Sequence, residues 1–422
     1  MRIFFDVSST HASGVKTGIQ RVVRSLATEL AKLAREDALE FSLVICDPNG
    51  SPRYVLLDPL AFDGTIEIEP LKPNLDVFYG SKSFRFFKRM SVFLKRIDFL
   101  GVLSSRLIKY LSKRFVEALH RLQKRSVRGP IFSYVDFTSG DVLLVFDAFW
   151  GVPNFVESAL RAKKCGANVV LLVNDIFPIT HPEYTERNNK ELFNKKIFES
   201  LGLADGLLFP SNVTKEAIIA NITPGGITIP NERVLYGAST KSQTFWVYDQ
   251  VERIPGSILM LGTIEPRKNH SLVLKWFLSK APENTILTII GADGWVNEEV
   301  KAIIRRESLN RPGLSWLESA SDEDVAVEMQ RHEIGVFASH AEGLGLPVIE
   351  YSAAGLKLVL SDIPVFREVA GDSGFYFDQY SVESLDHAIS RATAQEKALS
   401  IPNRSWGDTA IQVLDFCRKY FD

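Results

Sequence analysis

The sequence predicts an α/β protein built from two doubly wound, mainly parallel sheets. Short and almost continuously apolar runs recur along the 422 residues, as expected for parallel strands covered by helices on both faces. Helix-length amphipathic stretches separate these runs, which is the order of βαβ units. A polar, irregular stretch at Gly237–Gly256 divides the runs into two sets. We therefore expect two Rossmann-like domains joined by a linker there.

The predicted strands follow one another in chain order. In the first set they are Met1–Val7, Val142–Phe146, Val169–Val173 and Leu207–Phe209. In the second set they are Ile258–Gly262, Ile286–Gly291, Ile334–Ala338, Leu358–Leu360 and Gly374–Phe377. No internal repeat of short period accompanies them.

The composition is that of an ordinary globular protein. Apolar residues make up 45% and charged residues 24% of the chain, which excludes a disordered or fibrous protein. Lys and Arg number 49 against 51 Asp and Glu, so the net charge is −2. This balance excludes a protein that binds nucleic acid by bulk charge.

Three further features predict a cytoplasmic protein. Cys46, Cys165 and Cys417 are far apart and odd in number, which indicates a reducing compartment rather than a disulfide framework. Asp6 interrupts the N-terminal apolar run, so we expect no signal peptide. No stretch reaches the ~18 apolar residues of a membrane span.

One segment, Ser81–Arg128, departs from the overall charge balance. It contains 14 Lys and Arg against 2 Asp and Glu, a net charge of +12, while the rest of the chain carries −14. Phenylalanines are interleaved with the cations, and we expect the segment to be helical. Two interpretations stay open: a solvated pair of basic helices that covers the first domain, or a patch that docks on an anionic membrane surface.

The stretch Ala338–Asp362 is the most informative part of the sequence. It begins at the end of a predicted strand, and Gly343 and Gly345 allow a backbone to approach a ligand closely. Pro347 suits the first position of a helix. The free N–H groups and positive dipole end of a helix that begins there form a binding site for anions.

Two glutamates flank this anion-binding loop. Glu342 lies in the loop, and Glu350 lies eight residues later, in the first turn of the predicted helix. A carboxylate accepts two hydrogen bonds from vicinal hydroxyls, so the pair suits recognition of hydroxyl groups. On spacing alone the alternative is equally good: Glu350 complements the helix dipole and Glu342 is solvated.

A second stretch, Ile258–His270, places two cations after a predicted strand. The strand ends at Gly262, and a turn with Pro266 leads to Arg267 and Lys268. The carboxyl end of a parallel strand is where open α/β sheets bind ligands, and both cations suit a phosphate. The alternative is a solvated basic pair at the beginning of a helix, where it opposes the helix dipole.

Strand ends of the first set offer further candidates. Gly14 and Gly18 lie in a loop before an amphipathic helix, where they fit either a phosphate-approach loop or simple turns. Asn174 and Asp175 directly follow a strand at the ligand-binding edge, and Asp147 is in an equivalent place. Either aspartate can instead cap the next helix, which we favour for Asp147.

We expect no bound metal ion. Asp322, Glu323 and Asp324 match a D-x-D metal-binding pattern. However, Ser321 followed by Asp324 predicts a capped helix start instead. The histidines lack the spacing of a zinc site.

In combination these motifs resemble those of the retaining glycosyltransferases of family four. HAEGLGLPVIEYSAAG resembles their E-x7-E signature, GTIEPRKN their diphosphate-binding turn, and SDIPVFREVAGDSGFYFD the segment after the signature. TGIQRVVRSLA is similar to the N-terminal helix of a subgroup found in bacterial surface-polysaccharide synthesis. Three further strings resemble motifs of the family and follow one another in the same order along the chain: NDIFPITHPEY, PSNVTKEAI and RVLYGAS.

The resemblance implies the GT-B fold, in which two Rossmann-like domains face each other across a cleft. We expect an N-terminal, acceptor-side domain at 1–240 and a C-terminal domain that binds the nucleotide sugar at 241–404. The helix at 405–422 is expected to cross back to the N-terminal domain.

The resemblance also implies roles for single residues. Glu342 matches the glutamate that contacts the donor sugar, and Glu350 matches the one that binds the ribose hydroxyls. Arg267 and Lys268 match the cations on the donor diphosphate. The expected further donor-binding residues are Gly18, Gly262, Thr263, Gly343, Gly345 and Leu346.

Two positions depart from the family pattern. Many relatives have arginine where this chain has Thr263, so Arg267 is expected to serve alone. Many have histidine where this chain has Asn174. Asp175 is our candidate for the missing contact and the fourth catalytic residue, in an orienting role.

Together these features predict a metal-independent, retaining transferase without a cofactor. It would move a hexose, preferably mannose-type, from a nucleotide sugar, preferably GDP-linked, to a growing lipid-linked surface glycan. We expect it in the cytoplasm, peripheral on the inner face of the membrane. Two alternatives remain: a non-catalytic GT-B protein that binds a nucleotide sugar, and a nucleotide-sugar epimerase on the same fold.

Overall fold

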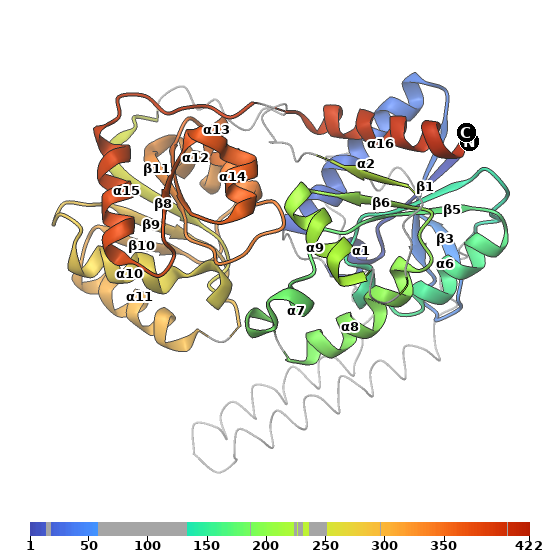
Figure 1. Ribbon diagram of the computed structural model, residues 1–422, viewed down its shortest axis with the longest axis horizontal. Coiled ribbons are helices and arrows are strands. Elements are labelled where there is room, and N and C mark those ends of the chain that lie inside the picture. The colour runs from blue at the N-terminus through green and yellow to red at the C-terminus, as the bar shows by residue number, and fades with distance from the viewer. Residues whose placement is uncertain are drawn as a thin grey trace, which may run out of the picture.

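The computed structural model describes residues 1–13, 18–57, 133–185, 187–222, 226, 231–235, 251–295, 297–402 and 404–422. They form two α/β lobes that lie beside each other in Figure 1, the N-terminal one blue and green and the C-terminal one mainly yellow and orange. The basic segment Ser81–Arg128, residue Gly14 and positions 237–250 of the predicted linker lie outside the described residues.

The first lobe contains a seven-stranded sheet with the order β3-β2-β1-β4-β5-β6-β7. Neighbouring strands are parallel except β2 and β3. The strands are β1 (Arg2–Asp6), β2 (Glu40–Cys46), β3 (Tyr54–Leu57), β4 (Val142–Val145), β5 (Asn168–Leu172), β6 (Gly206–Phe209) and β7 (Glu232–Val234). The helices are α1 (Ser8–Ser13), α2 (Gly18–Glu36), α6 (Phe155–Lys164), α7 (Phe177–Thr180), α8 (Arg187–Leu201) and α9 (Asn212–Ile222), with short 3-10 turns η2 (Phe149–Gly151) and η3 (Pro182–Tyr184).

The second lobe contains a six-stranded parallel sheet with the order β10-β9-β8-β11-β12-β13. The strands are β8 (Ile254–Leu261), β9 (Leu287–Ile290), β10 (Leu314–Leu317), β11 (His332–Phe337), β12 (Lys357–Ser361) and β13 (Gly374–Phe377). The helices are α10 (His270–Ser279), α11 (Glu298–Asn310), α12 (Asp322–Arg331), α13 (Leu346–Ala353), α14 (Pro364–Ala370) and α15 (Val382–Ala394), with 3-10 turns η6 (Pro266–Lys268) and η7 (Gly371–Ser373). The two parallel α/β sheets confirm the predicted fold class.

The beginning of β8 differs from the prediction. Ile254–Gly256, which we expected at the end of the linker, already belongs to this strand. Proline lacks an N–H group, but it is tolerated near the beginning of a strand, so Pro255 does not end the pairing. The pairing of β8 with β11 has an irregular register close by, between His332 and Ile334.

The last helix, α16 (Trp406–Phe421), packs on the first lobe although it follows the second in the chain. Figure 1 shows it beside α2, with the two chain termini next to each other. Ser405 and Asp408 form a capping box that fixes where the helix begins. Its buried face, including Val413 and Phe416, joins the core of the first lobe. This packing connects the two lobes at a second place besides the linker.

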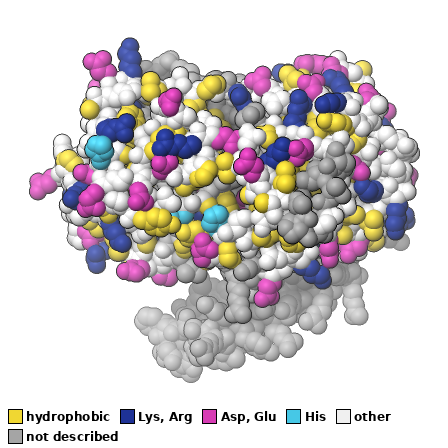
Figure 2. Space-filling model, viewed as in Figure 1, with side chains coloured by type: hydrophobic (Ala, Val, Ile, Leu, Met, Phe, Trp, Pro, Cys, Tyr) yellow, Lys and Arg dark blue, Asp and Glu magenta, His cyan; other side chains and the backbone are white. Residues whose placement is uncertain are grey.

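The surface of the described part of the chain is mixed in charge. On the face shown in Figure 2, acidic and basic side chains are interspersed. Within the residues that the structure describes, no helix is both long enough and apolar enough to span a bilayer.

Candidate active site

Two loops meet at the carboxyl edge of the second sheet. β8 and β11 are neighbours, so the loops that follow them, 262–269 and 338–345, leave the sheet side by side. The backbone N–H of His340 donates to the carbonyl oxygen of Arg267 at 2.9 Å. This hydrogen bond holds the basic loop against the loop that carries Glu342.

Glu342 lies at the centre of an ion cluster. Its Oε1 is 2.6 Å from Lys268 Nζ and 2.8 Å from Arg267 Nη1. Arg267 also donates to the Ala341 carbonyl and to Glu265 Oε1. The side chains of Glu342, Arg267 and Lys268 are only 9%, 15% and 13% exposed, so water screens their charges weakly.

Burial and close charges shift the pKa values of this cluster. Burial alone would raise the pKa of Glu342, but Arg267 and Lys268 outweigh burial and lower it to about 2. Glu342 is therefore ionised at neutral pH. Burial and the Arg267 cation lower the pKa of Lys268, and Glu342 offsets this only in part. A phosphate bound beside Lys268 would stabilise its charged form.

Glu350 occupies a different position from the predicted one. Helix α13 begins at Leu346, one residue before Pro347, so Glu350 is its fifth residue and lies in the second turn. Interaction with the helix dipole falls off within the first turn, which removes the main alternative role for Glu350. Instead, its Oε1 accepts a hydrogen bond at 2.5 Å from Arg21 of α2, in the other lobe.

Two of the predicted donor-site glycines lie where no side chain fits. A Cβ atom on Gly343 would be 2.1 Å from the carbonyl oxygen of Asn174, which follows β5 in the first lobe. Gly345 has a φ angle of 82°, and a Cβ atom there would be 2.6 Å from the Phe366 ring. Glycine is therefore required at both positions, one for contact between the lobes and one for the turn into α13.

The other predicted donor-site residues lie in both lobes. Gly262 has a φ angle of 144° and lies against the methylene groups of Lys268. Thr263 is half-buried in the following turn. Gly18 is the exposed first residue of α2. Leu346 packs against the cores of both lobes.

Asp175 faces this cluster from the first lobe. Its Oδ1 accepts a hydrogen bond from the backbone N–H of Phe177 at 3.3 Å. Burial raises the pKa of Asp175, and the positive charge of Arg267 partly offsets the shift. The Arg267 guanidinium lies 4.9 Å from the centre of the Phe177 ring. The structure thus brings Asp175 near Arg267 and Glu342, whereas Glu350 is paired with Arg21.

Several contacts between the lobes involve residues that the motifs did not single out. The hydroxyl groups of Ser211 and Thr214 donate to the carbonyl oxygen of Gly343 at 2.7 and 2.8 Å. The rings of Tyr184 and His340 stack at 5.2 Å across the two lobes. Ser211 and Tyr184 lie in strings that resemble the family, but only the packing of the lobes gives them a role.

Two sets of acidic residues have structural roles. Ser321 and Asp324 form the predicted capping box of α12. Asp147 does not cap the 3-10 turn after β4, contrary to our preference. Its carboxylate instead accepts hydrogen bonds from the backbone N–H groups of Thr10, at 2.6 Å, and Ala148. Within the described ranges, no group of three or more His, Cys, Asp or Glu side chains could hold a metal ion.

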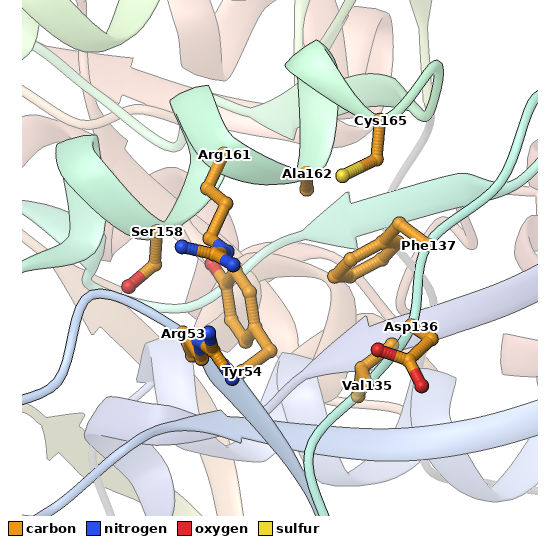
Figure 3. Close-up of a pocket in the computed structure, with 9 residues that line it drawn as sticks. All are labelled: Arg53, Tyr54, Val135, Asp136, Phe137, Ser158, Arg161, Ala162 and Cys165. Atoms are coloured by element: carbon orange, nitrogen blue, oxygen red, sulfur yellow. The ribbon is translucent and has the colours of Figure 1, made fainter.

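A small cavity in the first lobe lies apart from these loops. Figure 3 shows it between α6, β3 and the segment 133–137, lined by Arg53, Tyr54, Phe137, Arg161 and others. Its volume is about 90 Å³. None of the predicted site residues lines it, so it forms no part of the candidate active site.

His270, directly behind the basic turn, predicts a pH dependence of stability. Burial, assisted by Lys268, lowers the pKa of His270 to about 3. The unfolded chain takes up this proton near pH ~6.5 and the folded chain only near pH 3, so stability falls as the pH drops between these values. The slope from this group is at most about 1.4 kcal/mol per pH unit. Urea unfolding from pH 7 to pH 4 measures how the free energy of unfolding changes with pH. This free energy should fall less steeply in His270→Gln than in wild type. An equal pH dependence of the free energy of unfolding in both proteins would show that His270 is not its cause.

Comparisons with known proteins identify relatives of this chain. Residues 252–411 match the family model "Glycosyl transferases group 1". The chain is 27% identical over 270 residues to the serotype-specific mannosyltransferase WbdA of Escherichia coli, a match that covers 60% of this chain and only 33% of WbdA. It is 24% identical over 360 residues to the O-antigen chain mannosyltransferase B of Escherichia coli, covering 82% and 84% of the two chains.

The fold is similar to that of a solved structure. The structure of sucrose-phosphate synthase from Thermosynechococcus elongatus superimposes with a TM-score of 0.56 and 13% identity, over 100% of this chain and 95% of that one. At this identity the likeness concerns the fold alone. Residues 252–411 therefore form a group 1 glycosyltransferase domain, the chain is similar to O-antigen mannosyltransferases, and its two lobes have the GT-B architecture.

Proposed function

We propose that the protein is a retaining hexosyltransferase that moves a mannose-type sugar from a GDP-linked donor to a growing, lipid-linked surface glycan. The observation that carries the proposal is the buried cluster in which Glu342 holds Arg267 and Lys268 together. The names of the similar mannosyltransferases support the sugar and the surface glycan. The similarity to one bacterial subgroup favours the GDP-linked donor.

The chemistry of glycosyl transfer fits this cluster. The reaction passes through an oxocarbenium-like state while negative charge grows on the departing diphosphate. Preorganised positive charge at that place is the largest single contribution that a protein can make. Arg267 and Lys268 would supply it, and no bound metal is then needed.

Retention fits attack from the same face as the departing group. In this mechanism an oxygen of the departing phosphate takes the proton of the acceptor hydroxyl, so no strong general base is required. Asp175, close to Arg267 but on the first lobe, would orient the acceptor. Its hydrogen bond from the Phe177 N–H and its position opposite Arg267 support that role.

Glu350 is assigned to the ribose of the donor. Glu350→Ala should weaken binding of the nucleoside diphosphate by about 1–3 kcal/mol, because hydrogen bonds to a charged group are lost. Isothermal titration with the nucleoside diphosphate alone measures this effect without turnover. Equal affinities of variant and wild type would show that Glu350 does not bind the ribose.

The two alternatives differ from transfer in their products. A non-catalytic binding protein would bind the nucleotide sugar and release no nucleoside diphosphate. An epimerase would convert the nucleotide sugar without an acceptor. Release of nucleoside diphosphate only in the presence of an acceptor therefore supports transfer over both.

A peripheral association with the membrane is proposed from the sequence of Ser81–Arg128, which lies outside the described residues. Each basic residue near an anionic leaflet contributes about 1 kcal/mol, so a few are sufficient for reversible binding. Joint replacement of Lys88, Arg89, Lys95 and Arg96 by serine should reduce salt-sensitive co-sedimentation with phosphatidylserine vesicles. Activity on a soluble acceptor should stay unchanged. Equal co-sedimentation of variant and wild type would exclude this role.

A further inference from the structure

An ion pair joins the two lobes at the carboxylate assigned to the ribose. Arg21, the fourth residue of α2, donates from Nη2 to Glu350 Oε1 at 2.5 Å. The side chain of Glu350 is 4% exposed, and that of Arg21 is 36% exposed. The Glu350 carboxylate is the main cause of a raised pKa of Arg21, so the guanidinium stays charged.

The second oxygen of Glu350 has no such partner. Oε2 is buried and accepts no hydrogen bond from any residue that the structure describes. A carboxylate oxygen has room for two hydrogen bonds, and buried oxygens in folded proteins are rarely left without one. A hydrogen-bond donor would satisfy this oxygen. A hydroxyl group of a bound ligand meets that requirement.

We propose that Arg21 is a positioning residue for the nucleotide. It holds Oε1 of Glu350 and leaves Oε2 as the acceptor for the ribose hydroxyls. Because Arg21 and Glu350 belong to different lobes, recognition of the ribose then requires the lobes to be in contact. This inference rests on the proposed function, which assigns Glu350 to the ribose.

The geometry also distinguishes positioning from competition. A guanidinium can donate to both oxygens of a carboxylate, and such bidentate binding would exclude the ribose. Here one nitrogen of Arg21 contacts one oxygen, and the other oxygen stays available. Loss of Arg21 should therefore weaken ribose recognition, whereas loss of a competitor would strengthen it.

The test compares GDP with 2′,3′-dideoxy-GDP, which lacks the hydroxyls, by isothermal titration at one salt concentration. UDP and 2′,3′-dideoxy-UDP are measured in parallel. Wild type should prefer the ribonucleotide by ~10-fold, the equivalent of one charged hydrogen bond. Arg21→Ala should reduce this preference severalfold, and Arg21→Lys should restore part of it. Arg35→Ala removes an exposed cation from the same helix and should keep the full preference.

The preference is the ratio of the affinities for GDP and 2′,3′-dideoxy-GDP. A general loss of stability lowers both affinities and does not change their ratio. An undiminished preference in Arg21→Ala, or tighter binding of GDP, would overturn the positioning role. Glu350→Ala separates this result from a failure of the proposed function. If Glu350→Ala loses the preference and Arg21→Ala keeps it, only the role of Arg21 is wrong. If Glu350→Ala keeps it, or wild type shows none, the ribose assignment fails and the role of Arg21 fails with it.

Discussion

Arg267→Ala should lower kcat by ~10²-fold or more, because the lost charge stabilises the departing diphosphate mainly in the transition state. Arg267 lies against Glu342 and Glu265, and its side chain is only 15% exposed. A cation in such a weakly screened place acts strongly on a nearby anion. Steady-state kinetics with a nucleotide sugar and a soluble acceptor would measure the effect.

Two variants sharpen this prediction. Arg267→Lys keeps the charge but lacks the planar fork of the guanidinium, so its kcat should lie between those of wild type and the alanine variant. Arg305→Ala removes a surface cation of α11 that is 52% exposed, and it should leave kcat unchanged. A near-normal kcat of Arg267→Ala would remove the residue from the mechanism.

Gly343→Ala should lower kcat/KM by ~10²-fold, the second large effect that we expect. The added Cβ atom would lie 2.1 Å from the carbonyl oxygen of Asn174, so the loop or the opposite lobe must move by more than 1 Å. A shift of about that size at reacting groups can reduce the rate by this factor. The same loop carries Glu342 and receives the hydrogen bonds of Ser211 and Thr214.

The matched control for this glycine is Gly151→Ala. No atom lies within 4 Å of the position of its Cβ, so the methyl group should have no effect. Thermal unfolding of both variants checks that the lobes still fold. A kcat/KM of Gly343→Ala within twofold of wild type would show that the close approach of the lobes at Gly343 is not needed for turnover.

Most strands in the middle of the sheets were predictable from the sequence, as was the edge strand β13, whereas β2, β3, β7 and β10 were not. Runs such as Val142–Phe146 are apolar throughout because both faces of their strands are covered. β3, β7 and β10 lie at edges of the sheets, where one side has no neighbouring strand. β2, next to the edge strand β3, is buried only in its second half. β2, β7 and β10 contain polar residues and give no continuous apolar run. β3 is a short apolar run that was not predicted.

Only those residues of the candidate site that lie within a short sequence motif were predictable. The loop sequences identified Arg267, Lys268 and Glu342, but their contact depends on β8 and β11 being neighbours, which no local pattern encodes. Arg21 reaches Glu350 across 329 positions in the chain. Its pairing with Glu350 depends on the packing of one lobe on the other, and for this reason it could not be predicted from the sequence.

The most direct test of the account is a proton NMR time course of GDP-mannose with the protein, with and without p-nitrophenyl α-mannoside as acceptor. The account predicts that a new α-linked mannoside and an equal amount of GDP form only when the acceptor is present. A β-linked product would contradict retention. Conversion of GDP-mannose without acceptor, or binding with no product, would contradict glycosyl transfer itself.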